Sequence, residues 1–283
     1  MSARERGEVH CKMAKGMLID TSICTGCKAC HVACKEWNGL DPEPGHFKSD
    51  PETKLLADHF TGDSYDNTGA LSAADWRHVR FIEQFNDSRK GSRWLFMSDS
   101  CKHCTDAACM NVCPYSAIVR TEMGNVVVLQ DKCQGSQNCN AACPYGVVRY
   151  SEQSGTSRKC TLCNDRIHNG LGTACAKACP TGSIRFGEVA ELKARADARL
   201  AQLKASGEPR ANIYGYREAK GLHVFYLLMY QPSVYGLPEN PVVQQRPPSL
   251  PPLPASLGLL ALGVTALARF RERGARERAE EKG

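Results

Sequence analysis

Apolar residues form several short β-rich runs along this chain. The runs lie at residues 17–19, 126–129, 147–148 and 183–186. Runs of this kind, bounded by turn residues, are typical of short strands. Between Ile118 and Val126, residues 122–125 (Glu-Met-Gly-Asn) predict a hairpin turn. The pattern therefore predicts a small β-containing core interrupted by loops.

A helical pattern follows the last of these runs. Val189, Leu192, Ala196, Leu200 and Leu203 recur at steps of three and four residues, and Gly207 follows as a stop signal. We expect a helix of about four turns here, because a helix has 3.6 residues per turn. Its apolar side is expected to pack against the rest of the domain.

The pattern changes again near the C-terminus. Residues 237–254 are rich in Pro and show no periodicity, which predicts an extended linker or an arm on a partner. Residues 255–268 carry no charge, and a single membrane-spanning helix is predicted over 255–270. A soluble or interfacial helix remains the alternative, because a span needs about 20 apolar residues. Basic residues follow this run: Arg269, Arg271, Arg273, Arg276 and Arg278.

Composition and charge narrow the class of protein. Of the 283 residues, 42% are hydrophobic and 23% are charged, which is ordinary for a globular protein. Lys and Arg exceed Asp and Glu by 36 to 30, but they are scattered and do not alternate with aromatic residues, so no nucleic-acid partner is expected. The first residues lack an apolar signal-peptide core and a twin-arginine pair, so export by a signal peptide of this chain is not expected. Disulfide bonds, which need an oxidising compartment, are therefore not expected either.

Cysteine is the outlier, with 16 residues. Fifteen of them form four groups, and groups two, three and four are each followed by Pro. Cys11 lies outside every group and is interpreted as a free or buried thiol. Group one is Cys24, Cys27, Cys30 and Cys34; group two is Cys101, Cys104, Cys109 and Cys113; group three is Cys133, Cys139 and Cys143; group four is Cys160, Cys163, Cys175 and Cys179.

The spacing within the groups favours iron–sulfur clusters. Three thiolates on one tight loop can bind three irons of a small cube, and the fourth iron then needs a ligand from elsewhere. In two-cluster ferredoxins the last Cys of each run binds the other cluster of the pair. Four groups therefore predict two pairs and up to four clusters. Zinc sites usually combine two C-x2-C knuckles, often with His, so a zinc-stabilised scaffold is the weaker alternative.

Group three departs from the pattern, because Ser136 stands where its second cysteine is expected. Three outcomes are open: a three-iron cluster, a cubane with a Ser oxygen ligand, or a cubane with a water-ligated corner. Cys11 as a replacement ligand is the less favoured possibility. Because cluster type and charge set the potential, we expect this cluster to have the highest potential of the four.

These observations predict an α+β fold with two ferredoxin-like dicluster modules. The expected organisation is an N-terminal extension (1–16), a four-cluster domain (17–188) with an insertion (35–100), a helix and strands packed on it (189–236), the linker (237–254), the membrane helix (255–270) and a charged tail (271–283). No nucleophile, general base or phosphate-binding loop stands out, so catalysis is not expected of this chain alone.

Stretches outside the cysteine spacing carry a family resemblance. They are residues 34–38, 64–77, 159–167, 178–187 and 234–238. With the four groups, they resemble the iron–sulfur beta subunit of respiratory formate dehydrogenases over roughly residues 17 to 270. The four-group plan alone is shared with subunits of other molybdopterin oxidoreductases, such as nitrate, dimethyl sulfoxide and polysulfide reductases, and with some hydrogenases.

The resemblance implies a nested pairing of the groups, one with four and two with three. It implies three [4Fe-4S] clusters and one [3Fe-4S] or atypically ligated [4Fe-4S] cluster. The implied ligand sets are Cys24, Cys27, Cys30 and Cys179; Cys160, Cys163, Cys175 and Cys34; Cys101, Cys104, Cys109 and Cys143; and, for the defective site, Cys133, Cys139 and Cys113.

The resemblance also implies partners and a location. A catalytic subunit carrying molybdenum or tungsten would pass electrons to the outer pair of clusters. The inner pair would deliver them to a membrane cytochrome b or quinone at the inner membrane of a prokaryote. The positive-inside bias of the arginines would place the tail in the cytoplasm and the clusters on the periplasmic side.

Overall fold

The computed structural model describes residues 14–40, 71–84, 92–245 and 269. Cys11, part of the insertion, part of the linker and nearly all of the predicted membrane helix and tail lie outside these residues. Within the described ranges no helix is long and apolar enough to cross a membrane. The predicted span over 255–270 is represented there only by Arg269.

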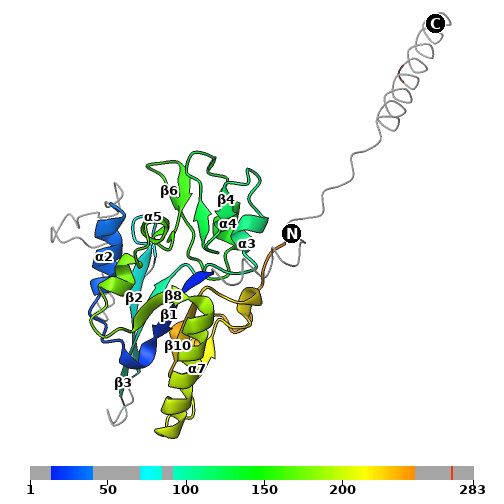
Figure 1. The fold of residues 1–283 in the computed structure, drawn as a ribbon. Coiled ribbons are helices and arrows are strands. Elements are labelled where there is room, and N and C mark those ends of the chain that lie inside the picture. Colours follow the sequence, from blue (N-terminus) through cyan, green and yellow to red (C-terminus); the bar gives the residue numbers. More distant parts are fainter. Residues whose placement is uncertain (1–13, 41–70, 85–91, 246–268, 270–283) are drawn as a thin grey trace, which may run out of the picture. The chain divides into compact units, whose positions relative to one another are not determined.

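A four-stranded sheet forms the centre of the larger module. Its order is β8-β1-β10-β9, with β1 parallel to β10 and antiparallel to β8, and with β9 antiparallel to β10. The sheet thus joins strands from opposite ends of the described chain (Figure 1). The strands are β1 (Lys15–Asp20), β8 (Ile184–Glu188), β9 (Asn212–Tyr214) and β10 (Val224–Leu228).

Helix α7 (Val189–Ala205) packs on this sheet, as the sequence predicts. Its buried side chains are Leu192, Ala196 and Leu203, which share the core with β1 and β10. Gly207 follows the helix with a φ of +95°, a conformation that glycine adopts without the steric cost of a Cβ.

A hairpin that the sequence analysis did not predict lies in the second half of the insertion. Strand β2 (Arg77–Gln84) pairs antiparallel with β3 (Arg93–Ser100), and Val79 and Met97 join the core of the sheet. We refer to the four-stranded sheet, this hairpin and the elements around them as the sheet module. Its short helices are η1 (Thr21–Ile23), α2 (Ala29–Trp37), α5 (Asn164–His168), α6 (Ala174–Lys177), η2 (Glu218–Lys220) and η3 (Pro232–Tyr235).

Residues 101–158 form a second, smaller unit that we call the hairpin module. It contains two antiparallel hairpins and two short helices, drawn in the upper part of Figure 1. Its core is small and includes Cys109, Cys113 and Cys139. The elements are α3 (Ala108–Asn111), β4 (Ile118–Arg120), β5 (Val126–Val128), α4 (Asn138–Ala142), β6 (Arg149–Ser151) and β7 (Thr156–Arg158).

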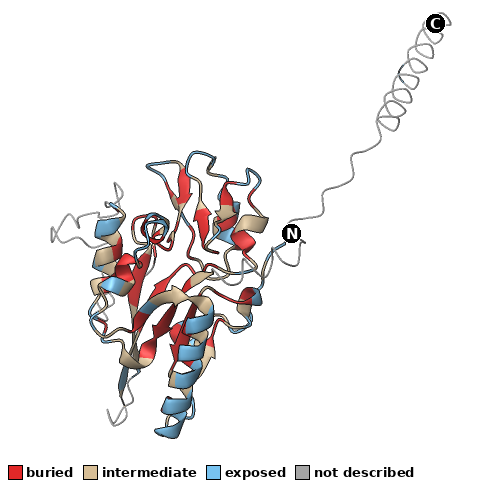
Figure 2. Ribbon diagram, viewed as in Figure 1, coloured by how far each residue is buried: buried red, intermediate tan, exposed pale blue. Residues whose placement is uncertain are grey.

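Three of the four predicted strands are confirmed, since the runs at 17–19, 126–129 and 183–186 coincide with β1, β5 and β8. The hairpin turn predicted at 122–125 connects β4 and β5. The strand predicted at Val147 and Val148 is wrong, because β6 begins at Arg149. Both valines are buried and line a cavity between cysteines. Their side chains therefore pack in the interior, but their backbone does not pair with another described strand. Buried residues concentrate in the strands of both modules (Figure 2).

Candidate metal centres

The four cysteine loops share a backbone feature. In each loop the residue before the second ligand position has a positive φ: Gly26 (+67°), His103 (+47°), Gly135 (+68°) and Leu162 (+61°). A left-handed residue turns the chain sharply, as in a tight turn, between the first and second ligand positions. Non-glycine residues pay a steric cost for this conformation, and such strain is often found at functional sites.

Group three keeps this loop geometry although it lacks a thiol. Ser136 follows Gly135 as Cys27 follows Gly26, and the next residue is again left-handed in both loops, Lys28 with a φ of 60° and Gln137 with a φ of 57°. Ser136 is exposed, as is Cys27. The hydroxyl of Ser136 therefore occupies the loop position that a thiol has in group one.

The structure brings the first three cysteines of group one near the last cysteine of group four. Burial raises the pKa of the Cys24 thiol, and the neighbouring thiols of Cys179 and Cys27 raise it further. Burial raises the pKa of Cys30 to about 11, and Cys175 and Cys24 lie among its neighbours. The Sγ of Cys30 also lies 3.3 Å from the Oγ of Ser98 in β3.

The last cysteine of group one, Cys34, lies instead among the other cysteines of group four. Burial raises its pKa well above the usual value, and the nearby thiols of Cys160, Cys175 and Cys163 add to this effect. Helix α2 carries Cys34 and packs against α6, which carries Cys175. The two groups thus exchange their last cysteines.

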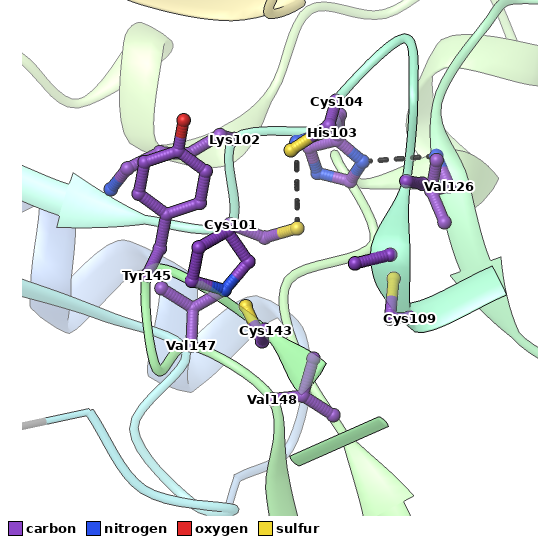
Figure 3. Close-up of a pocket in the computed structure, with 13 residues that line it drawn as sticks. Cys101, Lys102, His103, Cys104, Cys109, Val126, Cys143, Tyr145, Val147 and Val148 are labelled. Atoms are coloured by element: carbon purple, nitrogen blue, oxygen red, sulfur yellow. Dashed lines mark hydrogen bonds between the residues drawn. The ribbon is translucent and has the colours of Figure 1, made fainter. Parts of the chain in front are cut away.

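Groups two and three meet around a cavity in the hairpin module. Cys101, Cys104, Cys109 and Cys143 line a space whose empty volume is about 340 Å³, part of it open to solvent. Figure 3 shows their sulfur atoms facing this space. Burial raises the pKa of Cys109 to about 12, and Cys101 and Cys143 contribute to the rise.

His103 also lines this cavity. It is fully buried, and its Nδ1 accepts a hydrogen bond from the backbone N–H of Val126 at 3.0 Å (Figure 3). Burial, with the cationic Lys159 nearby, lowers its pKa well below the usual value, so the ring is neutral. Its Nδ1 is therefore already occupied by the hydrogen bond from the backbone of β5.

The remaining three cysteines of the hairpin module lie near one another. Burial raises the pKa of Cys139, and the thiols of Cys133 and Cys113 are among its charged neighbours. Ser157 is buried beside them: its backbone N–H donates to the Sγ of Cys133 at 3.4 Å, and its Oγ lies 3.2 Å from the Sγ of Cys139. Sequence reasoning missed Ser157, because it belongs to a polar strand far from group three.

Several backbone N–H groups point at cysteine sulfurs. The donors belong to His103, Leu162 and Ala117, at 3.5, 3.4 and 3.4 Å from the Sγ of Cys101, Cys160 and Cys113. Hydrogen bonds to sulfur stabilise its negative charge and tune the potential of iron–sulfur clusters.

The chemistry of these donor sets fits iron–sulfur clusters. Buried thiols that crowd one another resist ionisation, whereas a bound metal holds them as thiolates. In the described ranges, no three His, Cys, Asp or Glu side chains converge closely enough to hold a single metal ion. Each of the four sets of thiols would instead bind the several irons of one cluster.

Three buried cations lie among the thiols, and sequence reasoning missed all of them. Arg77, Lys102 and Lys159 are 0%, 1% and 2% exposed. Lys159 donates to the carbonyls of Val126 and Cys160. Burial opposes its charge, but the thiols of Cys101, Cys109 and Cys160 outweigh this and raise its pKa. Lys102 is paired with the carboxylate of Asp99, whereas Arg77 and Lys159 have thiols as their negative neighbours and are positioned to balance anionic clusters.

The chain matches two family models described as 4Fe-4S dicluster domains, over residues 23–117 and 92–189. Together with the thiol geometry, these matches define the class: an iron–sulfur protein of the dicluster type.

Curated relatives give a narrower assignment. The nitrate-inducible formate dehydrogenase iron–sulfur subunit of Escherichia coli is 39% identical over 230 residues, covering 80% of this chain and 73% of the relative. The formate dehydrogenase iron–sulfur subunit of Haemophilus influenzae is 37% identical over 261 residues, covering 91% and 79%. A subunit of the anaerobic dimethyl sulfoxide reductase of Escherichia coli is 35% identical over 178 residues, covering 63% and 75%.

This chain belongs to the family of formate dehydrogenase iron–sulfur subunits. The resemblance drawn from the sequence is therefore confirmed, and so is the electron-transfer role that the family implies.

Proposed function

We propose that the chain conducts electrons through four clusters from a molybdenum- or tungsten-containing formate dehydrogenase subunit to a membrane acceptor, without catalysing a reaction itself. The observation that carries this proposal is that each set of clustered thiols draws on two cysteine groups, in the nested order one with four and two with three.

We assign the ligands accordingly. Cluster 1 takes Cys24, Cys27, Cys30 and Cys179. Cluster 2 takes Cys160, Cys163, Cys175 and Cys34. Cluster 3 takes Cys101, Cys104, Cys109 and Cys143, and cluster 4 takes Cys133, Cys139 and Cys113.

Contacts between the sets support one linear order. Cys30 of cluster 1 lies near Cys175 of cluster 2, and Cys160 of cluster 2 lies near Cys101 of cluster 3. Cys101 and Cys160 also share a small apolar cluster with Leu71 and Val147. Cys109 of cluster 3 lies near Cys139 of cluster 4. Electrons would therefore pass from cluster 1 to cluster 4 in sequence.

Cluster 4 would be the exit to the acceptor. With Ser136 in a loop shaped for a ligand, the site would hold a three-iron cluster, a cubane with the Ser oxygen as ligand, or a cubane with a water-ligated corner. A hard oxygen ligand suits iron–sulfur chemistry less well than thiolate, which favours the three-iron form. A high potential at this position would suit delivery to a cytochrome b or quinone.

The complex would work at the inner membrane of a prokaryote, with the clusters on the periplasmic side and the tail in the cytoplasm. The catalytic subunit would dock beside cluster 1, and the cytochrome-type subunit beside cluster 4. The basic residues after position 268 support this orientation, because arginines near a span favour the cytoplasmic side.

The match to the dimethyl sulfoxide reductase subunit favours a second candidate, the same role in another molybdopterin enzyme. The large subunit that co-purifies with this protein separates the two, since a formate-oxidising partner supports the first and a sulfoxide-reducing partner the second.

Low-temperature EPR of the anaerobically purified protein, with iron counted on the same sample, tests the proposal. We expect a three-iron signal as isolated and several interacting four-iron signals after dithionite. Four cubane signals without a three-iron signal would mean that oxygen, water or Cys11 completes cluster 4. A silent sample containing zinc would refute the proposal.

A further inference from the structure

Arg77 is a buried cation at the start of β2. Its side chain is 0% exposed. Nη1 donates to the Oγ of Ser98 at 2.8 Å, and Nη2 donates to the Oγ of Ser100 at 2.9 Å. Its Nε is buried without a hydrogen-bond partner in the part of the chain that the structure describes. A guanidinium is costly to bury unless its charge is balanced.

No described carboxylate balances this charge. Both hydroxyl partners of Arg77 are neutral, and no described Asp or Glu lies within ion-pair distance of it. Arg80, three residues further along β2, is different, since its guanidinium lies 3.1 Å from the carboxylate of Asp99. The negative charge that compensates Arg77 must therefore come from another kind of group.

Two short paths connect Arg77 to cysteine sulfurs of different clusters. Through Ser98, whose Oγ lies 3.3 Å from the Sγ of Cys30, it reaches the set assigned to cluster 1. Through the Sδ of Met17, which lies 3.8 Å from Nη2 and accepts from the Sγ of Cys175 at 3.7 Å, it reaches the set assigned to cluster 2. Arg77 thus lies between the two sets.

The electrostatics agree with this placement. Burial alone would lower the pKa of Arg77, but the negative charge of nearby thiolates outweighs burial and raises the pKa above its ordinary value. All of the thiolates concerned belong to groups one and four: Cys175, Cys160, Cys30 and Cys34.

We propose that Arg77 is a fixed positive charge shared by clusters 1 and 2, and that it raises the reduction potentials of both. Reduction adds one electron, and hence one negative charge, without forming or breaking a bond. A nearby cation favours the reduced state, most strongly where burial keeps water from screening it. Arginine keeps its charge over the working pH range, so its contribution needs no proton uptake. The inference rests on the ligand sets proposed above.

The first experiment compares Arg77→Gln, Arg77→Lys and Arg80→Gln in the purified holoprotein. Potentiometric titration followed by EPR gives the midpoint potential of each cluster. In Arg77→Gln we expect the equilibrium constants for one-electron reduction of cluster 1 and of cluster 2 both to fall, each at least tenfold, which equals 59 mV or more. Arg77→Lys keeps the charge and should recover most of this shift. Arg80→Gln removes a charge from the same strand. Arg80 is partly exposed and faces Asp99, a carboxylate that it shares with Lys102, so this change should alter the potentials much less.

Two outcomes would overturn the inference. Unchanged potentials in a fully loaded Arg77→Gln protein would show that the charge does not act on the clusters. A shift in Arg77→Lys as large as in Arg77→Gln would assign the effect to shape rather than to charge. In both cases the wild-type spectrum still reports whether four clusters are present, so failure here is distinguishable from failure of the proposed function.

Arg77→His serves if Arg77→Gln does not assemble its clusters. The imidazolium carries the charge at low pH and loses it as the pH rises, so one folded protein samples both states. We expect the potentials of clusters 1 and 2 to fall with rising pH more steeply than in the wild type. A difference from the wild type that does not vary with pH would count against the inference. A further outcome is that neither Arg77→Gln nor Arg77→His loads its clusters while Arg77→Lys does. In that case the positive charge is required already for cluster insertion, which supports the position of Arg77 between the two clusters.

Discussion

The sheet module and the hairpin module hold equivalent cysteine loops in different ways. Among the described residues, the core of the sheet module has 23 buried members, of which two are cysteines. The core of the hairpin module has eight, of which three are cysteines. Its strands have only three residues each. A small core cannot offset the entropy of folding unless ligands supply part of the stability.

The comparison teaches that the same metal-binding loop can be an addition to a fold or a part of its core. In the sheet module, β10 is fully buried and makes ladders on both sides without any cysteine. In the hairpin module, the thiols and what they bind occupy the place of apolar side chains. The departure at Ser136 therefore falls in the module that depends more on its clusters.

The largest expected effect comes from removing one cysteine ligand in each module. Cys109→Ala should open the hairpin module and reduce its local unfolding free energy by at least about 3 kcal/mol, on the scale of losing a large core side chain. Cys30→Ala, the matched change in the sheet module, should leave β10 protected. Hydrogen exchange resolved by peptide measures both, and equal protection loss in the two modules would contradict the proposed difference.

The contact between the modules gives the next largest effect. Gly124, in the turn between β4 and β5, has a φ of +86°, and an added Cβ would lie 2.4 Å from the ring of His223. Gly124→Ala should destabilise the protein by about 3 kcal/mol, through backbone strain together with overpacking.

Gly170→Ala is the control for this substitution. Gly170 also has a positive φ, +72°, but nothing lies near its missing Cβ. It should cost only about 1 kcal/mol, from backbone conformation alone. Thermal or chemical denaturation gives both values, and equal losses would show that the contact with His223 contributes nothing.

His223 makes the same junction sensitive to acid. Burial, then the cations Arg120 and Lys193, lowers its pKa to about 4, although the carbonyl of Lys15 opposes this. The unfolded chain binds a proton near pH 6.5 but the folded one does not until about pH 4, so stability falls as the pH drops through this window. We expect a loss of about 2 kcal/mol after allowance for partial solvent screening.

The measurement is denaturation at a series of pH values between 7 and 4, on the scale set by the ordinary histidine pKa. His223→Gln should flatten the profile in this window. An unchanged slope would assign the acid sensitivity to other groups, such as the buried His103.

Ser136→Cys should have the smallest effect on stability, within about 0.5 kcal/mol, because the residue is exposed and its loop already has the shape of group one. Its effect on cluster 4 is instead spectroscopic. We expect the three-iron EPR signal to be replaced by a four-iron signal of lower potential.

Ser136→Ala is the companion variant. It should leave a three-iron signal intact, whereas it would destabilise a cubane that uses the Ser oxygen. Loss of the wild-type signal in Ser136→Ala would therefore contradict the three-iron assignment and identify the hydroxyl as a ligand.

Much of the site could be predicted from local sequence. The cysteine spacing predicted four loops, and the runs at 17–19, 126–129 and 183–186 predicted three strands, because ligand spacing and strand propensity act over a few residues. The hairpin of β2 and β3 was missed because its sequence does not alternate: Arg77, His78 and Val79 are all buried, and the next four residues are only partly so. Val147 and Val148 misled in the opposite direction, being apolar without forming a strand.

The sequence by itself determined the class of protein, its family, and the loops that present thiols to metal. The family resemblance also implied which groups pair, whereas only the tertiary structure decided that Arg77 and Lys159 lie buried among the thiols. The physical reason is the distance along the sequence over which each interaction acts. A cysteine loop is shaped by neighbours along the sequence, whereas the charge balance of Arg77 depends on Cys30 and Cys175, which meet it only when β2, α2 and α6 pack together.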